Sequence, residues 1–478
     1  MARDGRASRM KRLVSLAAFL AIPLSACATV GPDYGAPGAR ALNVPASYYS
    51  VEATPGSPEE LAHWWTRFDD PVLNELVQQA VTQNLDLAVA SARLRQAREG
   101  VVQARAGALP SVGASAGAGR NFDSDGEDRS SFSLGADAAW EVDLFGGIRR
   151  GVEAAEADAE GAVFDLAAVQ VAIIGDVATN YIQARLAQQR LETARDTLAI
   201  ADENLEIAGW RVQAGLVSSQ DQEQARAQRA QTAASIPGIE RDFASATYRL
   251  AVLTGQAPGA LTAALREPRT IPTGPDSIAV GIPADTLRQR PDVRAAERTL
   301  AAQTARIGVA EAQLYPGLRL TGNIGSSAVS LGGLVDVITG GIFGGLSQSL
   351  FEGGRLRSQV RSQEAAAEAA LASYRQSVLV ALEDVENGLL ALDAAQRRQE
   401  QFAVALEAAN NTAILARSQY RAGLTDFQTL LEAERSLLSA RDGIDSSRAE
   451  QALALIQLYG ALGGGWDPLA TPEIGTNA

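Results

Sequence analysis

The sequence is poor in the side chains on which metal, redox and nucleophilic chemistry depend. Its 478 residues include one cysteine (Cys27), one histidine (His63) and two methionines, Met1 and Met10. A single cysteine excludes an internal disulfide and a thiolate metal cluster. The sequence also lacks H-E-x-x-H, G-x-S-x-G and phosphate-loop motifs. We therefore expect a protein that is not an enzyme and that holds no metal and no diffusible cofactor.

Aromatic side chains and positive charge are scarce as well. Aromatics make up 5 % of the chain, and much of the 46 % hydrophobic share is alanine. This composition is typical of long, closely packed helices rather than of a large globular core. The 42 basic residues, of which Lys11 is the one lysine, are outnumbered by 56 acidic residues, and the formal net charge is −14. Such an acidic balance argues against a nucleic-acid-binding surface.

The first 27 residues have the composition of an export signal. Basic residues precede the short apolar run Leu13–Ala21, and small residues follow it, which predicts a signal peptide at 1–26. The sequence Leu24-Ser25-Ala26-Cys27 matches the bacterial lipobox, in which the cysteine is acylated and becomes the mature N-terminus. The alternative is that Cys27 is an ordinary residue of a longer signal. Alanine rather than aspartate at position 28 resembles outer-membrane sorting.

The remainder of the chain contains an internal duplication. Leu144-Phe145-Gly146-Gly147 recurs 206 residues later as Leu350-Phe351-Glu352-Gly353, and Ala214-Gly215-Leu216 recurs 208 residues later as Ala422-Gly423-Leu424. Further landmarks repeat in the same order, although coincidence in a chain rich in Ala, Leu and Gly is the alternative. The predicted organisation is an N-terminal tether at 27–70, a first repeat at 71–255, a linker at 256–283, a second repeat at 284–464 and a mobile tail at 465–478.

Each repeat is expected to contain a helix, a β-hairpin and a long helical hairpin. Apolar and polar residues alternate over Phe132–Leu144, which is the period of a strand. The long helices lack proline for about 65 residues, or roughly 100 Å, whereas Pro237 should kink the first return helix. The predicted elements are Leu73–Ala106, a β-hairpin at 111–144 and helices at 149–255, then Ala284–Leu314, a β-hairpin at 317–351 with its second strand at Ile342–Leu350, and helices at 354–462.

These strands can cross a membrane only in an assembly of several chains. After the signal, no segment reaches the roughly 18 uninterrupted apolar residues of a spanning helix, so any crossing must use β-strands. Four strands per chain cannot close a barrel, because the smallest closed membrane barrels have about eight. We therefore predict a membrane α+β protein in which several chains share one barrel above a cylinder of long helical hairpins.

The motifs of the mature chain resemble those of the TolC family of outer-membrane efflux ducts, and specifically its lipidated, NodT-type branch. The matching stretches are Cys27–Tyr34, Trp64–Leu73, Asp143–Gly147, Arg290–Glu297, Ile307–Ala310 and Tyr315-Pro316. The resemblance implies a homotrimer with a 12-stranded β-barrel continuous with a long α-helical barrel in the periplasm. It also implies two partners, a periplasmic adaptor protein and an inner-membrane pump, commonly of the RND class.

The implied function is that of a passive exit duct for drugs and other small molecules, anchored by lipid in the outer membrane. One alternative is an exit duct for type I protein secretion with an ABC transporter. Another is a periplasmic coiled-coil spacer without a pore. The strand alternation disfavours the spacer, and lipidation together with the Arg290–Glu297 motif favours efflux.

The resemblance also assigns roles to residues at the turns of the long helical hairpins. Glu432 falls on a carboxylate ring in the periplasmic gate, and Tyr420 and Asp221 match a hydrogen-bonded pair that latches neighbouring helices. The sequence departs from relatives at Thr425, where some carry a latch arginine, and at Gln428, where others carry leucine. The alternatives are a solvated carboxylate at Glu432 and simple helix stops at the glycines. The residues expected to dock the adaptor are Gly215, Leu216, Ser218, Gly423, Leu424 and Thr425.

Overall fold

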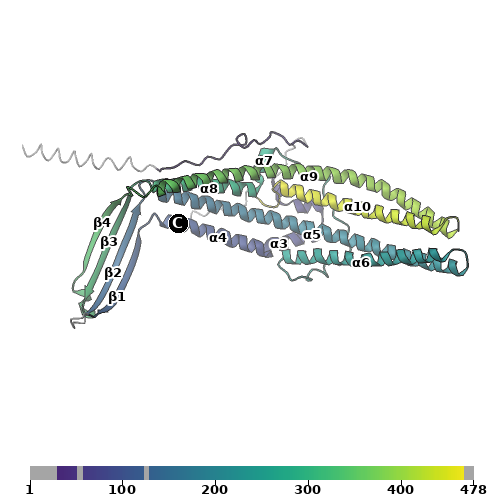
Figure 1. Cartoon of the computed structure of the whole chain (residues 1–478), viewed down its shortest axis with the longest axis horizontal. Helices are drawn as coiled ribbons and strands as arrows, with labels where there is room; N and C mark the ends of the chain where they lie inside the picture. The colour runs from purple at the N-terminus through teal and green to yellow at the C-terminus, as the bar shows by residue number, and fades with distance from the viewer. Residues whose placement is uncertain (1–28, 51–57, 123–128, 468–478) are drawn as a thin grey trace, which may run out of the picture. The chain divides into compact units, whose positions relative to one another are not determined.

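The computed structural model describes residues 29–50, 58–122 and 129–467 (Figure 1). These residues form two compact units. Unit 1 consists of residues up to Gly38, Arg93–Val163 and Ala295–Gln376, and unit 2 consists of Ala39–Ala92, Phe164–Arg294 and the residues from Ser377 onward. Each unit therefore draws on both halves of the chain. The predicted signal peptide and Cys27 lie outside the described residues.

Unit 1 contains one antiparallel sheet with the strand order β1-β2-β3-β4 (Figure 1). The predicted four strands are confirmed, and pairing of β2 with β3 joins the hairpin of the first repeat to the hairpin of the second. Strands β1 and β4 are therefore the two edges of the sheet. The strands are β1 (Ser111–Asn121), β2 (Arg129–Val142), β3 (Gly317–Ala328) and β4 (Thr339–Ser347).

The last strand differs from the predicted Ile342–Leu350. It begins earlier, because Thr339 pairs with Gly325 of β3, and it ends at Ser347, which pairs with Gly317. Pro316 precedes Gly317 and has no N–H to extend the ladder, so the partner strand stops there. Leu350 lies beyond the sheet and is exposed.

The first helix of each predicted repeat is two helices in the structure. The first repeat has α3 (Pro71–Gln83) and α4 (Leu85–Ala106), and the second has α7 (Pro283–Gln289) and α8 (Pro291–Ala312). Asn84 interrupts the first because its side-chain oxygen caps α4 by accepting from the N–H groups of residues 86 and 87.

The second break lies at Arg290, before Pro291. The proline favours an extended conformation for the residue that precedes it, and Arg290 has φ −71° and ψ 120°. The predicted single helices Leu73–Ala106 and Ala284–Leu314 are therefore wrong at these two positions.

Four helices form the long hairpins, and they are α5 (Gly147–Gln213), α6 (Ser219–Leu253), α9 (Arg355–Arg421) and α10 (Phe427–Ala461). Helices α5 and α9 have 67 residues each, which corresponds to roughly 100 Å. Pro237 lies inside α6, which continues to Leu253. Among the described helices, α5 alone has the length and hydropathy of a membrane span, and 44 % of its most apolar window is buried within the protein.

The core of unit 2 includes residues from the predicted tether and from the predicted linker. Trp64 is 1 % exposed and stacks on Tyr459 with ring centroids 5.1 Å apart. The predicted linker between the repeats contributes Leu265 and Val280, each 1 % exposed, to the same core. Apolar side chains thus secure this proline- and glycine-rich segment to the helices.

The predicted mobile tail is wrong for its first residues. The N–H of Gly465 donates to the carbonyl of Leu61 over 2.9 Å. Trp466 is 5 % exposed, and its indole N–H donates to the carbonyl of Gln289 over 3.0 Å. A buried aromatic ring with a satisfied N–H holds this end of the chain in unit 2. Residues 468–478 lie outside the description.

Candidate functional site

The turns of the two long hairpins are built in the same way. Gly215 and Gly423 have φ values of 69° and 74°, which glycine adopts without a steric penalty. In each turn the glycine N–H donates to the carbonyl three residues back over 3.0 Å, and the following leucine N–H donates five residues back over 2.9 Å. This pair of bonds is the Schellman motif, which satisfies carbonyls at a helix end.

Apolar side chains lie exposed at and near these turns. Leu216 is 72 % exposed and Leu424 is 78 % exposed. One turn before Gly215, Trp210 is 59 % exposed near the end of α5. We call Trp210, Leu216 and Leu424 the tip residues. Large apolar side chains at exposed turns suit a protein–protein contact, in which tryptophan is enriched.

The residues that begin the return helices differ between the two turns. Asp426 caps α10, and its side chain accepts a hydrogen bond of 2.8 Å from the N–H of Thr429. Hydrogen bonds from Thr429 hold the pKa of the Asp426 carboxyl below its usual value. Ser218 occupies the corresponding position before α6 but makes no capping hydrogen bond with its side chain. Thr425, before Asp426, is partly exposed.

Behind the turns, all four long helices share one apolar cluster, in which Tyr420 is 1 % exposed. Within one chain, the predicted hydrogen bond between Tyr420 and Asp221 is not formed, and the Tyr420 hydroxyl has no partner among the described residues. The Tyr420 ring packs against Phe427 with centroids 5.7 Å apart. Asp221 lies instead in the first turn of α6, where Ser218 Oγ donates to it over 3.5 Å. Their shared role in a latch stays a prediction. The cluster consists of Ala208, Ala225, Ala416, Tyr420, Phe427, Leu430 and Ala433.

Two glutamates near the start of α10 have opposite surroundings. Glu432 is exposed, and no described residue forms an ion pair with it. The Glu434 side chain is 14 % exposed, accepts a hydrogen bond of 2.9 Å from Asn204 Nδ2 and pairs with Arg417 Nε at 3.1 Å. Glu434 thus links α10 to α5 and α9. Sequence reasoning missed this link, because neither its helical spacing nor its neighbours distinguish Glu434 from a surface residue.

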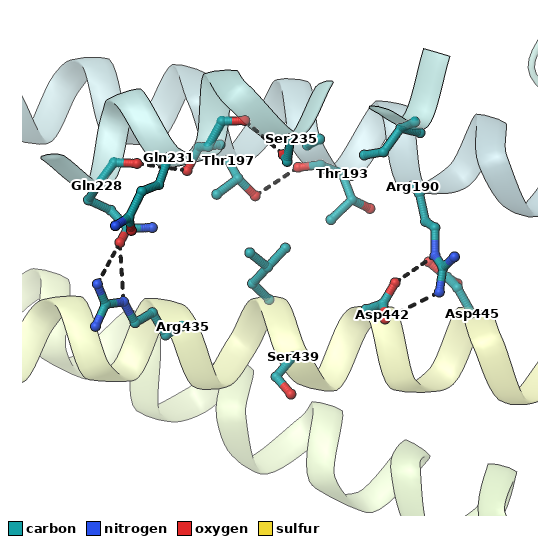
Figure 2. A pocket seen from close by; sticks show the side chains of 14 residues that line it. Arg190, Thr193, Thr197, Gln228, Gln231, Ser235, Arg435, Ser439, Asp442 and Asp445 are labelled. Carbon is teal, nitrogen blue, oxygen red and sulfur yellow. Dashed lines mark hydrogen bonds and ion pairs between the residues drawn. The ribbon is translucent and has the colours of Figure 1, made fainter. Parts of the chain in front are cut away.

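A groove with a volume of about 560 Å³ separates α5 and α6 from α10 (Figure 2). At one end Arg435 donates to Gln228 Oε1 over 2.8 Å, and at the other Arg190 Nε donates to Asp442 Oδ1 over 2.7 Å. Between these ends, Figure 2 shows mostly hydroxyl-bearing side chains. Asp445 lines the groove, and burial raises the pKa of its carboxyl.

The groove continues the face of α10 that carries Glu432. Arg435, Ser439 and Asp442 follow Glu432 at steps of three and four residues, so the four side chains lie on one face of the helix. All four are exposed. Glu432 and the groove therefore lie on the same side of α10.

The segment after Cys27 is fixed to unit 1 by Arg150. The N–H of Val30 donates to the carbonyl of Phe145 over 3.1 Å. Arg150, whose side chain is 5 % exposed, donates to the carbonyls of Val30 and Gly31 and pairs with Asp33 at 2.6 Å. We call these contacts the tether clamp. They attach the tether beside the junction between β2 and α5.

Comparison with known proteins identifies the family. The family described as "Outer membrane efflux protein" matches residues 76–256 and 282–464. Nodulation protein T of Rhizobium leguminosarum bv. trifolii is 33 % identical over 460 residues, which cover 95 % of this chain and 97 % of that protein. The pyoverdine export outer membrane protein OpmQ of Pseudomonas putida is 32 % identical, with 94 % of this chain and 96 % of that protein covered.

Solved structures show the same fold. The outer-membrane channel OprN superposes with a TM-score of 0.83 at 37 % identity and covers 92 % of this chain and 100 % of its own. VceC of Vibrio cholerae superposes with a TM-score of 0.77 at 28 % identity and covers 85 % and 99 %. The fold and the site define an outer-membrane channel. The chain belongs to the outer membrane efflux protein family, and the predicted resemblance to TolC-type channels is confirmed.

Proposed function

We propose that three copies of this chain form one passive duct, through which an inner-membrane pump expels small molecules by way of a periplasmic adaptor. The sheet carries this proposal. Its order leaves β1 and β4 as edges, and open edges are not tolerated in lipid. Pairing β4 of one copy with β1 of the next in a closed ring of three would give twelve strands, enough to enclose a channel.

The relatives support small molecules as the cargo. One relative is named for pyoverdine export, and another, from Pseudomonas putida, is named as the outer membrane protein of a toluene efflux pump. We infer cargo of similar size for this chain, delivered by an RND-type pump.

The assembly is tested by native mass spectrometry of the detergent-extracted protein. Trimers are expected, because a four-stranded sheet leaves two edges unsatisfied in the membrane. Single-channel recordings of the same preparation should show ion conductance. A stable monomer that conducts ions would contradict the proposed architecture. A trimer that does not conduct, either unmodified or with the proposed gate residues exchanged, would contradict the channel.

The hairpin turns are proposed to dock the adaptor. Gly215 and Gly423 shape the turns, and Ser218 and Thr425 lie before the return helices α6 and α10. The tip residues would supply the apolar contacts. Exchanging Leu216 or Leu424 for aspartate should weaken adaptor binding roughly ten-fold or more without changing the amount of trimer, since both side chains are exposed. Surface plasmon resonance with the co-purified adaptor measures the loss.

A matched control for the docking variants lies farther along α9. Val404 is 65 % exposed and lies 17 positions before Arg421 at the end of the helix, or roughly 25 Å away. Val404→Asp should bind the adaptor like the unmodified protein. Equal losses at Val404 and at the two leucines would exclude the turns as the docking surface.

A lipid anchor at Cys27 is proposed as well. The tether clamp fixes Val30 beside Phe145, just after the end of β2. The three residues from Cys27 to Val30 can span only about 10 Å. Acyl chains on Cys27 would therefore enter the membrane close to the barrel, each buried CH₂ contributing about 0.8 kcal/mol.

Mass spectrometry of the N-terminal peptide tests the anchor. Cys27→Ser should lack the acyl mass and still fractionate with the outer membrane, since the barrel itself holds the protein there. An unmodified Cys27 in the mature protein would exclude the lipoprotein assignment.

Glu432, Tyr420 and Asp221 are proposed to close the periplasmic end of the duct. An idle channel must be closed, or the outer membrane would leak. We place the closure at the helical turns, because the exposed Glu432 lies just beyond the second turn. Three copies around one axis would bring three carboxylates together and favour cations.

A further inference from the structure

Arg211 and Tyr420 join the two hairpins directly behind their turns. Arg211 lies near the end of α5, and Tyr420 lies near the end of α9. The guanidinium carbon of Arg211 is 4.3 Å from the centroid of the Tyr420 ring. Arg211 Nη2 also donates a hydrogen bond of 2.7 Å to the backbone carbonyl of Tyr420. One side chain therefore holds both the ring and the backbone of the facing hairpin.

Each copy of the duplication supplies one half of this contact. With the offset of 208 residues between Gly215 and Gly423, the counterpart of Arg211 is Gln419, and the counterpart of Tyr420 is Val212. Neither counterpart can reproduce the pair, because glutamine carries no charge and valine carries no aromatic ring. The contact is thus specific to the pairing of the first hairpin with the second.

The surroundings strengthen the contact. Tyr420 is 1 % exposed, and a cation over a desolvated ring is attracted more strongly than one at the surface. The bonded carbonyl is at the C-terminal end of α9, where the helix dipole favours a cation. The nearby ion pair between Arg421 and Glu203 links the same two helices, α9 and α5. Its side chains are 62 % and 52 % exposed, so solvent screens it.

We propose that Arg211 is a positioning residue of the gate, which holds the first turn against the second turn of the same chain and so limits the resting aperture. This inference rests on the proposed function as a gated duct. It assigns the holding contact to the ring and the carbonyl of Tyr420. The Tyr420 hydroxyl, which has no hydrogen-bond partner within the described chain, is not needed.

Four variants of the full-length channel in planar bilayers test the inference. Arg211→Gln removes both the cation over the ring and the charged donor to the carbonyl, and should raise the open fraction at rest roughly ten-fold. Tyr420→Leu removes the ring but leaves the backbone carbonyl, so it should raise the open fraction by a smaller factor. Arg211→Lys keeps the charge and should restore part of the closure. Tyr420→Phe keeps the ring and the carbonyl and should stay within about two-fold of the unmodified channel. Arg421→Gln is the matched control, because it removes an exposed charge from the same turn, and it should behave like Tyr420→Phe.

A distance measurement separates positioning from general destabilisation. Spin labels at Ala214→Cys and Ala422→Cys report the separation of the two turns. The labelled chains are diluted with unlabelled chains, so that each channel carries one labelled pair. The unsubstituted protein is the control for labelling at Cys27. The distance should lengthen and broaden with Arg211→Gln and remain unchanged with Tyr420→Phe and Arg421→Gln.

Three outcomes decide between the possibilities. Unchanged aperture and distance in Arg211→Gln, in a channel that Glu432→Gln still alters, would overturn the role of Arg211 and leave the proposed function standing. If Tyr420→Phe opens the channel as much as Tyr420→Leu does, the role of Arg211 is also overturned. The Tyr420 hydroxyl would then be the group that holds the gate. Absence of conductance in the unmodified protein and in every variant would overturn the proposed function itself.

Discussion

Glu432→Gln is expected to abolish block of the channel by multivalent cations and to reduce its preference for cations over anions. Three carboxylates around one axis repel one another, and a bound multivalent cation relieves that repulsion. The concentration for half-block should rise roughly ten-fold or more when the three charges are removed. Single-channel recording with a trivalent amine complex in the periplasmic-side solution measures both effects.

Glu434 provides the control for the gate variant. It lies two residues away and carries the same charge, but Asn204 and Arg417 already hold its carboxylate. Glu434→Gln should leave cation block unchanged, because that charge is neutralised within the chain. If both variants lose block equally, the effect comes from total charge at the channel mouth, and Glu432 has no special place in the gate.

Arg150→Ala is expected to destabilise unit 1 by about 3 kcal/mol, because it leaves the carbonyls of Val30 and Gly31 without their donor. The expected loss of stability is large because the buried guanidinium of Arg150 makes several charge-assisted hydrogen bonds. Gly31 adds to the tightness of the clamp, since a Cβ at this position would lie 2.4 Å from Gly308 Cα. Thermal dissociation of the detergent-extracted assembly should occur at a lower temperature in this variant.

The adjacent Arg149 serves as the comparison for Arg150. Its side chain is 50 % exposed and pairs with Asp143 at 3.3 Å. Arg149→Ala should change stability by at most about 0.5 kcal/mol, because exposed ion pairs contribute little. Equal destabilisation by the two alanine variants would show that charge on this turn of α5, and not the tether clamp, supports unit 1.

Local sequence patterns predicted the elements of this protein well. Alternation over Phe132–Leu144 predicted β2, and glycine at 215 and 423 predicted both helix ends. Pro291 carried the signal for the break at Arg290, since a residue before proline avoids the helical conformation. The break at Asn84 is harder to predict, because its side chain both caps α4 and donates to the carbonyl of Leu253 over 2.8 Å.

Contacts between the repeats could not be predicted in the same way. Trp466 follows glycines, which favoured a mobile tail, yet its ring is buried and its indole N–H donates to Gln289. Tyr420 was predicted beside Asp221, and the structure places it under Arg211 instead. Each of these depends on a partner that is distant in the sequence, and no spacing or composition in either segment specifies which partner it is.

The sequence by itself determined the duplication, the strands, the long helices and the turns that end them, because each follows from the side chains of neighbouring residues. The tertiary structure alone decided which hairpin side chains meet. Arg211 and Tyr420 lie 209 positions apart along the chain, as Asn204 and Glu434 lie 230 apart. Such pairs form only when two long hairpins pack in one particular register, and that register is fixed by the combined burial of many small apolar side chains along all four helices.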